Sequence, residues 1–360
     1  MFSRRFFGIL HSIRFCFCCC PSLRRLLSFI SCLDRLESAT VCGEEKTEIG
    51  RDFLVEQGSK KSAFIAIVGR PNVGKSSLLN SMLGQKIAIV SQKPQTTRTR
   101  IMGVLTEEET QTVFIDTPGL LQPRNRLGEF MVRSVLESVS GVDACLLVVE
   151  AGRKTSRSAL ELIDRFRSQN MPAILAINKI DLLQDKTALM EQIAGVTRLY
   201  DFEAVVPVSA KTGSGVEDLK KELFALAEPG EHFFDDDTLT DQPERVIASE
   251  IVREKLLRLL SAEIPHGIGV VVERMAERPD RGGITDITAT IYCERESHKA
   301  IIIGKSGDML KRVGTYARED MEQFFGCKVN LQLWVKVKEN WRNRQSALRM
   351  MGYDSSGFDA

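Results

Sequence analysis

Five short apolar runs alternate with helical segments between residues 63 and 227, and this alternation limits the fold more than any other feature of the chain. The runs are rich in Val, Ile and Leu and lack the period of two that marks a half-exposed strand, so we expect strands buried on both faces. The predicted strands cover residues 63–68, 111–115, 144–149, 173–177 and 204–208, with two more at 87–90 and 101–105. The predicted helices cover residues 75–83, 128–140, 156–169, 186–195 and 216–227. This order predicts an α/β domain in which helices cover both faces of a mostly parallel sheet.

A different pattern begins near Pro229. Residues 229–245 are acidic and contain Gly230 and Pro243, which is typical of a linker. The elements expected after it are a helix (246–263), two strands (269–278 and 284–293), two helices (297–303 and 307–325) and a strand (328–337). We therefore predict an N-terminal extension at 1–60, an α/β domain at 61–228, a linker at 229–245, an α+β domain at 246–340 and a C-terminal tail at 341–360.

Composition adds two limits. The chain has 360 residues, 43% of them hydrophobic and 27% charged, which suits a globular protein of two modest domains. Its net charge is +1, so any surface that binds nucleic acid must be local. Beyond residue 43 the cysteines Cys145, Cys293 and Cys327 lie far apart, which predicts free thiols in a reducing compartment.

The first 60 residues differ from the rest. No acidic residue precedes Asp34, whereas arginine, phenylalanine, leucine and serine are frequent. An organellar transit peptide, a membrane-associating segment and an unstructured extension read from an upstream start codon all fit this composition. A transmembrane helix is not expected, because no stretch has about 18 uncharged apolar residues in a row.

A glycine-rich stretch follows the first predicted strand and opens the first predicted helix. It matches G-x-x-x-x-G-K-[ST], a pattern that in this context binds nucleotide phosphates through backbone amides and a helix N-terminus. The predicted phosphate-binding residues are Gly69, Arg70, Pro71, Asn72, Val73, Gly74, Lys75 and Ser76. Lys75 is expected to reach the β- and γ-phosphates, and the Ser76 hydroxyl to bind Mg²⁺.

A second motif, Asp116-Thr117-Pro118-Gly119, follows the strand at 111–115. A carboxylate at this edge of the sheet can hold Mg²⁺ through water, and the Gly119 amide can meet the γ-phosphate. Ligands bind at the carboxyl ends of strands in open α/β sheets, so we expect this turn to lie beside the phosphate loop.

Two further motifs predict guanine as the base. Asp181 in Asn178-Lys179-Ile180-Asp181 can accept hydrogen bonds from N1–H and the exocyclic amine of guanine, a donor pair that adenine lacks. Asn178 can brace the loop and contact N7, while the Lys179 stem can lie along the ring. The stretch Ser209-Ala210-Lys211 ends the next strand and can donate an amide to guanine O6.

The second domain carries a G-x-x-G loop, Gly304-Lys305-Ser306-Gly307, between two predicted helices. Such a loop clamps the backbone of single-stranded nucleic acid in KH domains. Ten basic and five acidic residues lie between residues 297 and 345, a local charge of +5 that suits phosphate groups. A charged solvated surface, or one that faces anionic lipid, remains an alternative for this region.

The four nucleotide motifs resemble those of the translation-factor-like GTPases. Asn72 within the phosphate loop and Gln95-Thr96-Thr97-Arg98 after it make the chain similar to the Era family, over roughly residues 62–353. The resemblance implies a switch I at residues 95–100, where Thr97 or Thr96 binds Mg²⁺, and a switch II at residues 118–126. The residues implied to switch are Gln95, Thr96, Thr97, Asp116, Thr117, Pro118, Gly119 and Leu120.

The resemblance also implies the chemistry. Leu120 stands where Ras-like enzymes have a water-orienting glutamine, so another group must assist hydrolysis. Related GTPases with an asparagine in the phosphate loop use K⁺ in place of an arginine finger, and Asn72 is then its expected ligand. We expect slow, Mg²⁺-dependent conversion of GTP to GDP and phosphate by Ser76, Thr97, Asp116 and their neighbours.

Family membership would further imply a C-terminal type II KH domain that binds small-subunit ribosomal RNA of the 16S type near its 3′ end, and a role in 30S subunit assembly. It would imply a monomer in the cytoplasm with loose contact to the inner face of the membrane. An organellar location follows instead if residues 1–60 are a transit peptide. A constitutive RNA-binding scaffold and a membrane-associated regulatory GTPase remain the alternative functions.

Overall fold

The computed structural model describes residues 60–353, except residues 92, 94, 121, 122, 124, 261–266 and 279–282. The predicted N-terminal extension at 1–60 therefore lies outside the described residues, apart from Lys60. Within the described part of the chain, no helix combines the length and the apolar character needed to cross a bilayer.

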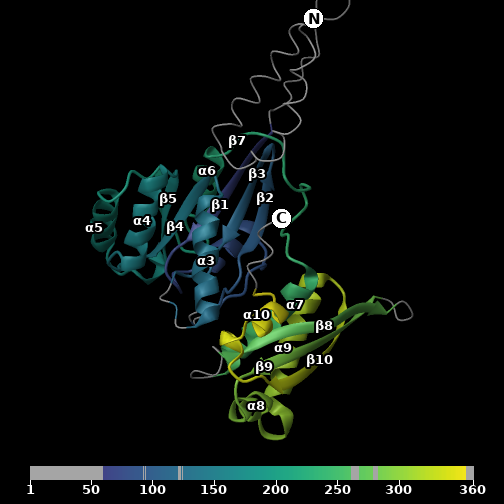
Figure 1. The fold of residues 1–360 in the computed structure, drawn as a ribbon. Helices are drawn as coiled ribbons and strands as arrows, with labels where there is room; N and C mark the ends of the chain where they lie inside the picture. The colour runs from purple at the N-terminus through teal and green to yellow at the C-terminus, as the bar shows by residue number, and fades with distance from the viewer. Residues whose placement is uncertain are drawn as a thin grey trace, which may run out of the picture. The chain divides into compact units, whose positions relative to one another are not determined.

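The first sheet has the strand order β2-β3-β1-β4-β5-β6 (Figure 1). Its strands are β1 (Lys61–Val68), β2 (Ile101–Glu107), β3 (Thr110–Asp116), β4 (Ala144–Glu150), β5 (Ala173–Asn178) and β6 (Ala204–Pro207). The pairs are parallel except that β2 runs antiparallel to β3, and the short β7 (Glu228–Pro229) runs antiparallel to β1. The carboxyl ends of the parallel strands therefore meet at one edge of the sheet.

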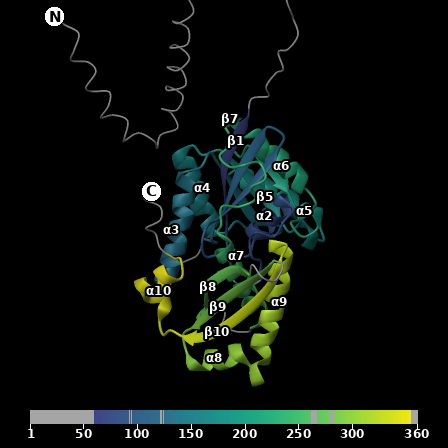
Figure 2. The same ribbon diagram turned by 90° about the vertical axis from the view of Figure 1, so that its right-hand side faces the viewer.

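Helices cover both faces of this sheet (Figures 1 and 2). They are α2 (Lys75–Leu83), α3 (Arg126–Ser140), α4 (Arg157–Gln169), α5 (Lys186–Thr197) and α6 (Val216–Ala225). Ile65 and Ile67 of β1 belong to one buried core, and the alternate residues Ala66 and Val68 belong to another. Strands buried on both sides explain why their sequence lacks polar alternation. The predicted α/β architecture is confirmed.

The strand predicted at residues 87–90 is wrong, because this segment has no strand pairing. Its polar backbone groups bond to a side chain instead. Asn80 Oδ1 of α2 accepts hydrogen bonds from the amides of Ile87 (3.1 Å) and Ala88 (2.9 Å), and Asn80 Nδ2 donates to the Ala88 carbonyl (2.8 Å). The segment is therefore part of the loop that joins α2 to β2, which we call the α2–β2 loop (residues 84–100).

The segment predicted as a linker follows the first sheet closely. The buried Gln111 of β3 accepts hydrogen bonds from the amides of Phe233 and Phe234 through its Oε1, at 2.8 and 3.0 Å. The Leu239 carbonyl accepts from the Val104 amide of β2. These bonds fix the path of the chain between the two domains.

The second domain has the predicted order α-β-β-α-α-β. Its elements are α7 (Glu244–Leu259), β8 (Gly269–Arg278), β9 (Ile284–Cys293), α8 (Glu296–Ile303), α9 (Asp308–Phe325) and β10 (Lys328–Val337). In the sheet order β10-β9-β8, β9 pairs antiparallel with β8 and parallel with β10. Apolar residues of α7 and α9 pack on this sheet and form the core of the second domain.

Residues 341–353 fold against the first domain. They form η4 (Trp341–Asn343) and α10 (Gln345–Met350), which lie beside one end of α3 (Figure 2). Trp341 is fully buried, and its Nε1 donates to the Gly267 carbonyl at 2.9 Å. It shares a core with Leu127 and Met131 of α3. This part of the segment predicted as a tail therefore joins the two domains.

Candidate functional site

Two glycines give the loop between β1 and α2 its path. Gly69 (φ 148°) and Gly74 (φ 97°) occupy backbone conformations that favour glycine. A Cβ on Gly69 would lie 2.4 Å from the Val148 carbonyl oxygen, and one on Gly74 would lie 2.3 Å from Asn178 Nδ2. The loop therefore passes closely along β4 and β5 and leads directly into the N-terminus of α2.

Lys75 and Asp116 are a buried pair of opposite charges at this edge of the sheet. Lys75 Nζ donates to the carbonyls of Gly69 and Arg70, both at 3.3 Å. Burial lowers the pKa of Lys75 to about 8, against the opposing effect of Asp116. Burial likewise raises the pKa of Asp116 to about 6, against the opposing effect of Lys75. Both shifts have the same cause, because the burial of these side chains excludes water and disfavours their charged forms.

Three oxygen-bearing side chains meet beside this pair. Ser76 Oγ donates to Asp116 Oδ2 at 2.5 Å and lies 2.8 Å from Thr97 Oγ1, which is itself 3.5 Å from Asp116 Oδ2. The Thr96 hydroxyl points elsewhere and donates to the Lys93 carbonyl at 2.6 Å. The three residues predicted as Mg²⁺ ligands are therefore brought together, and Thr97 rather than Thr96 faces the other two.

The same three residues fit a magnesium ion. Asp116 Oδ1 is buried, and among the described residues it has no hydrogen-bond partner, so this oxygen is available to a cation or its water. Hydroxyl and carboxylate oxygens are the donors that Mg²⁺ prefers. The donor set at Ser76, Thr97 and Asp116 is therefore of the right chemical type.

The motif after β3 packs against the glycine-rich loop. Thr117 is buried and its Oγ1 donates to the Ile67 carbonyl at 2.8 Å. A Cβ on Gly119 would lie 2.5 Å from the Pro71 backbone nitrogen, so only glycine fits here. The Leu120 amide donates to the Gly69 carbonyl at 3.2 Å. Thr117, Pro118, Gly119 and Leu120 therefore lie beside the predicted phosphate site.

The two motifs predicted to select guanine are joined to each other and to the glycine-rich loop. Asn178 Nδ2 donates to the Val73 carbonyl at 2.9 Å, while Asn178 Oδ1 accepts from the amides of Ala210 and Lys179. Ser209 Oγ donates to Asp181 Oδ1 at 2.7 Å. A single buried amide therefore fixes three loops in one arrangement, with Asp181 exposed at the edge.

A cavity of about 810 Å³ lies over these motifs. The predicted residues that line it are Asn72, Gly74, Asn178, Lys179, Asp181, Ala210 and Lys211. A smaller cavity of about 50 Å³ adjoins it and is lined by Pro71, Lys75, Ser76, Gln95, Thr96, Thr97 and Gly119, among others. The cavity is also lined by residues that no sequence motif indicated: Ser77, Val90, Ser91, Lys93, Leu182, Leu257 and Arg258. Ser77 directly follows the G-x-x-x-x-G-K-[ST] motif, so its place in the cavity could have been predicted. Leu257 and Arg258 belong to α7, where no sequence motif indicates a nucleotide site.

The Arg98 side chain does not line either cavity and instead contacts the second domain. It is 1% exposed and its Nη1 donates to the Ile268 carbonyl at 2.6 Å. Its guanidinium lies 5.7 Å from the centre of the Trp341 ring and 6.0 Å from that of Tyr353. The segment predicted as switch I is therefore bonded to the second domain through Arg98 and, by a hydrogen bond from Arg253, through the Thr96 carbonyl.

The G-x-x-G loop of the second domain lies between α8 and α9. Gly304 (φ 76°) has no room for a side chain, because a Cβ there would lie 2.7 Å from Met309 Cβ. Lys305 and Ser306 are exposed, and Gly307 (φ 84°) precedes the first residue of α9. The loop therefore presents one lysine and the N-terminus of an 18-residue helix to solvent.

The basic residues of this domain divide into those that form ion pairs and those that do not. Several are neutralised by carboxylates: Lys299 by Glu296, Arg318 and Lys328 by Glu322, Lys336 by Glu273, and Arg342 by Glu294. Within the part of the chain that the structure describes, Lys305, Lys311 and Arg312 form no ion pair. Lys338 and Arg344 likewise form no ion pair among the described residues, so the G-x-x-G loop and the start of α9 carry part of the positive charge available to a ligand.

The chain matches two families in succession. Residues 64–179 match the family described as 50S ribosome-binding GTPase, and residues 263–342 match the KH domain family. GTPase Era of Clostridioides difficile (strain 630) is 50% identical over 294 residues, which are 82% of this chain and 99% of that protein. GTPase Era of Ruminiclostridium cellulolyticum is 47% identical over 298 residues, which are 83% and 99%.

Two solved structures share this arrangement. A crystal structure of an Aquifex aeolicus Era variant bound to GDP and AlF4⁻ has a TM-score of 0.78 and 37% identity, covering 81% of this chain and 99% of that one. A crystal structure of Era in complex with MgGDPNP and nucleotides 1506–1542 of 16S ribosomal RNA also has a TM-score of 0.78 and 37% identity, covering 82% and 99%. Sequence and structure agree over both domains. The chain therefore belongs to the Era family of GTPases, enzymes that hydrolyse GTP, and consists of a GTPase domain followed by a KH domain.

Proposed function

We propose that this chain is a GTP-controlled switch that binds small-subunit ribosomal RNA near its 3′ end and assists assembly of the 30S subunit. The observation that carries the proposal is that the four nucleotide motifs meet around two adjoining cavities, in a chain that also presents an exposed G-x-x-G loop. The Era relative in complex with MgGDPNP and a 16S RNA segment supports the choice of both ligands.

The proposed nucleotide site divides its work among the motifs. The amides of residues 69–76 and the Lys75 ammonium group hold the phosphates; burial lowers the pKa of Lys75, and an adjacent phosphate would favour its charged form. Asp181 accepts from the guanine edge, while Asn178 holds the surrounding loops. Lys179 and the 209–211 segment form the rest of the base site.

Ser76, Thr97 and Asp116 hold the magnesium ion in this proposal. The ion neutralises charge that develops on the phosphate oxygens. Thr97 already faces Ser76 and Asp116, which supports Thr97 over Thr96 as the residue of switch I that meets the ion. The Thr96 side chain instead shapes the α2–β2 loop.

Hydrolysis is proposed to be slow and stimulated by K⁺. This chain has Leu120 where Ras-like enzymes have a glutamine, and the leucine side chain has no group that can orient water. Asn72 lines both cavities and has a left-handed backbone (φ 64°), which supports a place beside the phosphates. Its side chain is our proposed K⁺ ligand.

The KH domain is proposed to hold RNA at Gly304, Lys305, Ser306 and Gly307. The amides of this loop and the N-terminus of α9 suit a phosphate, and Lys305, Lys311 and Arg312 add charge. The protein is proposed to act as a monomer in the cytoplasm, and its similarity to bacterial Era proteins supports the location. Peripheral contact of the basic KH surface with the inner membrane is part of the same proposal.

The test is the affinity of the full chain for a 16S-type 3′-end RNA, measured with a non-hydrolysable GTP analogue and with GDP. Because binding linkage is reciprocal, a switch requires different RNA affinities in the two states and different nucleotide affinities with and without RNA. A scrambled RNA of the same length is the control for charge alone. Equal affinities with GTP analogue and GDP would contradict the switch and favour a constitutive RNA-binding scaffold.

A further inference from the structure

Helix α7 of the KH domain is buried all round at its centre. Residues 251–257 are all buried, although three of them, Arg253, Glu254 and Lys255, carry charge. Glu254 is 0% exposed. An isolated buried carboxylate is costly, so Glu254 must be stabilised by the groups around it.

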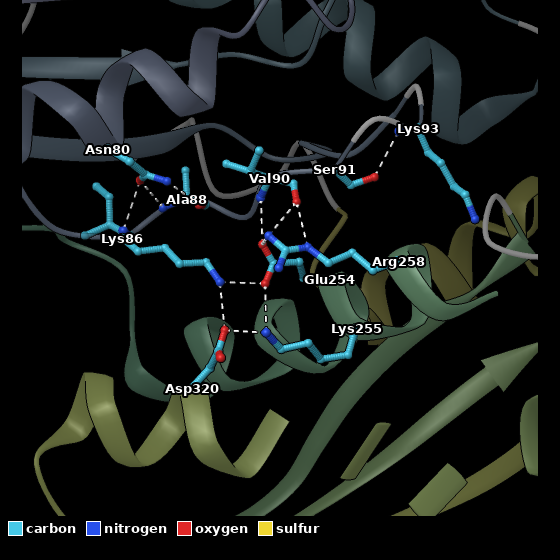
Figure 3. Close-up of polar contacts among 11 residues, drawn as sticks. Asn80, Lys86, Ala88, Val90, Ser91, Lys93, Glu254, Lys255, Arg258 and Asp320 are labelled. Atoms are coloured by element: carbon cyan, nitrogen blue, oxygen red, sulfur yellow. Dashed lines mark hydrogen bonds and ion pairs between the residues drawn. The ribbon is translucent and has the colours of Figure 1, made fainter. Parts of the chain in front are cut away.

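Those groups come from the GTPase domain as well as from the KH domain (Figure 3). Glu254 Oε1 accepts from the Val90 amide at 3.0 Å, and Oε2 accepts from Lys86 Nζ at 2.6 Å. Arg258, one turn later on α7, donates to Glu254 Oε1 at 2.9 Å and to the Val90 carbonyl at 3.2 Å. Both polar backbone groups of Val90 are therefore bonded to the other domain.

The Glu254 carboxylate is also held by charged residues of its own domain. Lys255 Nζ lies 3.3 Å from Glu254 Oε2 and bonds to Asp320 of α9, while Lys86 Nζ reaches the same Asp320 oxygen at 2.8 Å (Figure 3). Burial alone would raise the pKa of Asp320, but its hydrogen bonds to Lys255 and Lys86 lower it. The alternating charges of this cluster thus fix the orientation of the Glu254 carboxylate toward the Val90 amide.

Val90 belongs to the wall of the 810 Å³ cavity, and so do Ser91 and Lys93 of the same loop. The two ends of this loop are anchored to the GTPase domain, by Asn80 up to Ala88 and by Thr97, which bonds to Ser76 and Asp116. Among the described residues from 89 to 96, each hydrogen bond that leaves the loop ends on the KH side. The bonds run from Val90 to Glu254 and Arg258, from Thr96 to Arg253, and from Lys93 to Leu260.

The KH domain also reaches the cavity directly. Leu257 and Arg258 of α7 line it together with the residues of the guanine motifs. A nucleotide in this cavity would therefore be enclosed on one side by a loop that α7 holds and by α7 itself.

We propose that Glu254 is a positioning residue for guanine nucleotides: it fixes the Val90 wall of the pocket from the KH domain and thereby slows nucleotide release. The inference rests on the proposed nucleotide site and goes beyond it, because it makes a helix of the RNA-binding domain part of that site. By linkage, a bound nucleotide must in turn tighten the contact between α7 and the α2–β2 loop.

The test is the rate at which a fluorescent GDP analogue leaves the full chain after addition of excess GDP in Mg²⁺. Glu254→Gln keeps the size and the acceptor of the side chain but removes the charge that Lys86, Lys255 and Arg258 share. We expect release at least about tenfold faster than in the unaltered chain, which corresponds to about 1.4 kcal/mol.

Glu322→Gln is the matched control. Glu322 likewise accepts from a backbone amide, that of Val329 at 3.2 Å, and pairs with Arg318 and Lys328. All of these partners lie within the KH domain, so this variant is expected to lower the melting temperature yet release GDP at the unaltered rate. Equal acceleration in both variants would show a general loss of stability and overturn the proposal.

Lys86→Ala provides a second route if Glu254→Gln folds poorly. Lys86 is 41% exposed, so its removal leaves no cavity, and we expect a smaller acceleration in the same direction. A chain that binds GDP but releases it at one rate with or without these substitutions overturns the role of Glu254 alone. A chain that binds no GDP at all overturns the nucleotide site itself, so the two failures are distinguishable.

Discussion

Asn178 shows how single side chains assemble the nucleotide site. Its amide bonds to Val73, Lys179 and Ala210, and a side chain on Gly74 would collide with it. Such residues could be predicted, because the motifs are local and their spacing dictates the chemistry. Glu254 and Arg258 could not, since their contacts with Val90 span 164 and 168 residues and depend on how two domains dock.

Asp181 provides the residue-level prediction. Asp181→Asn replaces an acceptor by an amide, so we expect GTP affinity to fall by about tenfold to a hundredfold, as for loss of a charged hydrogen bond. Affinity for xanthosine triphosphate should rise, because xanthine offers an acceptor where guanine offers an amine. Competition binding with both nucleotides measures the change. Unaltered GTP affinity in this variant would remove the guanine assignment.

Elements were predicted well where their surroundings impose a simple period. Strands β8, β9 and β10 have the predicted bounds, because half-buried or fully buried strands carry a strong apolar signal. The segment at 87–90 has the same apolar signal but forms no strand. Its amides are taken by Asn80 and Glu254, and a lone run of apolar residues does not reveal that competition.

The loop between α8 and α9 gives the prediction at this scale. Lys305→Ala removes one cation that has no ion-pair partner among the described residues, so RNA affinity should fall and the slope of log affinity against log salt should shrink by about 1. Lys328→Ala is the control, because Glu322 already pairs with Lys328. Filter binding across a salt series measures both. Equal effects of the two substitutions on RNA affinity would contradict the assignment of the G-x-x-G loop as the RNA-binding site.

Among the described residues, the contacts that join the two domains include the segment after β7, the α2–β2 loop against α7, and residues 341–353 against α3. Sequence alone predicted two domains and their order. It did not predict that the last segment is an interdomain core, because Trp341 becomes buried only when both domains supply neighbours. The predicted domain boundaries stay predictions.

The two tryptophans of the chain test this joint. Trp341 is fully buried at the interdomain core, whereas Trp334 on β10 is 59% exposed. Trp341→Ala should lower the free energy of unfolding by about 3–5 kcal/mol, the usual effect of a large truncation in a core. Trp334→Ala should change it by about 0.5 kcal/mol or less, since its site is at the surface. Urea unfolding followed by circular dichroism compares them, and similar losses would contradict the burial of Trp341.

The most direct test of the nucleotide site is calorimetric titration of the pure full chain with GDP, with and without Mg²⁺, and with ADP as the control. The arrangement of Lys75, Ser76, Asp116 and Asp181 predicts one site per chain, tighter uptake of GDP with Mg²⁺, and no comparable heat from ADP. Absence of magnesium-dependent GDP binding, or equal binding of ADP, would contradict the account.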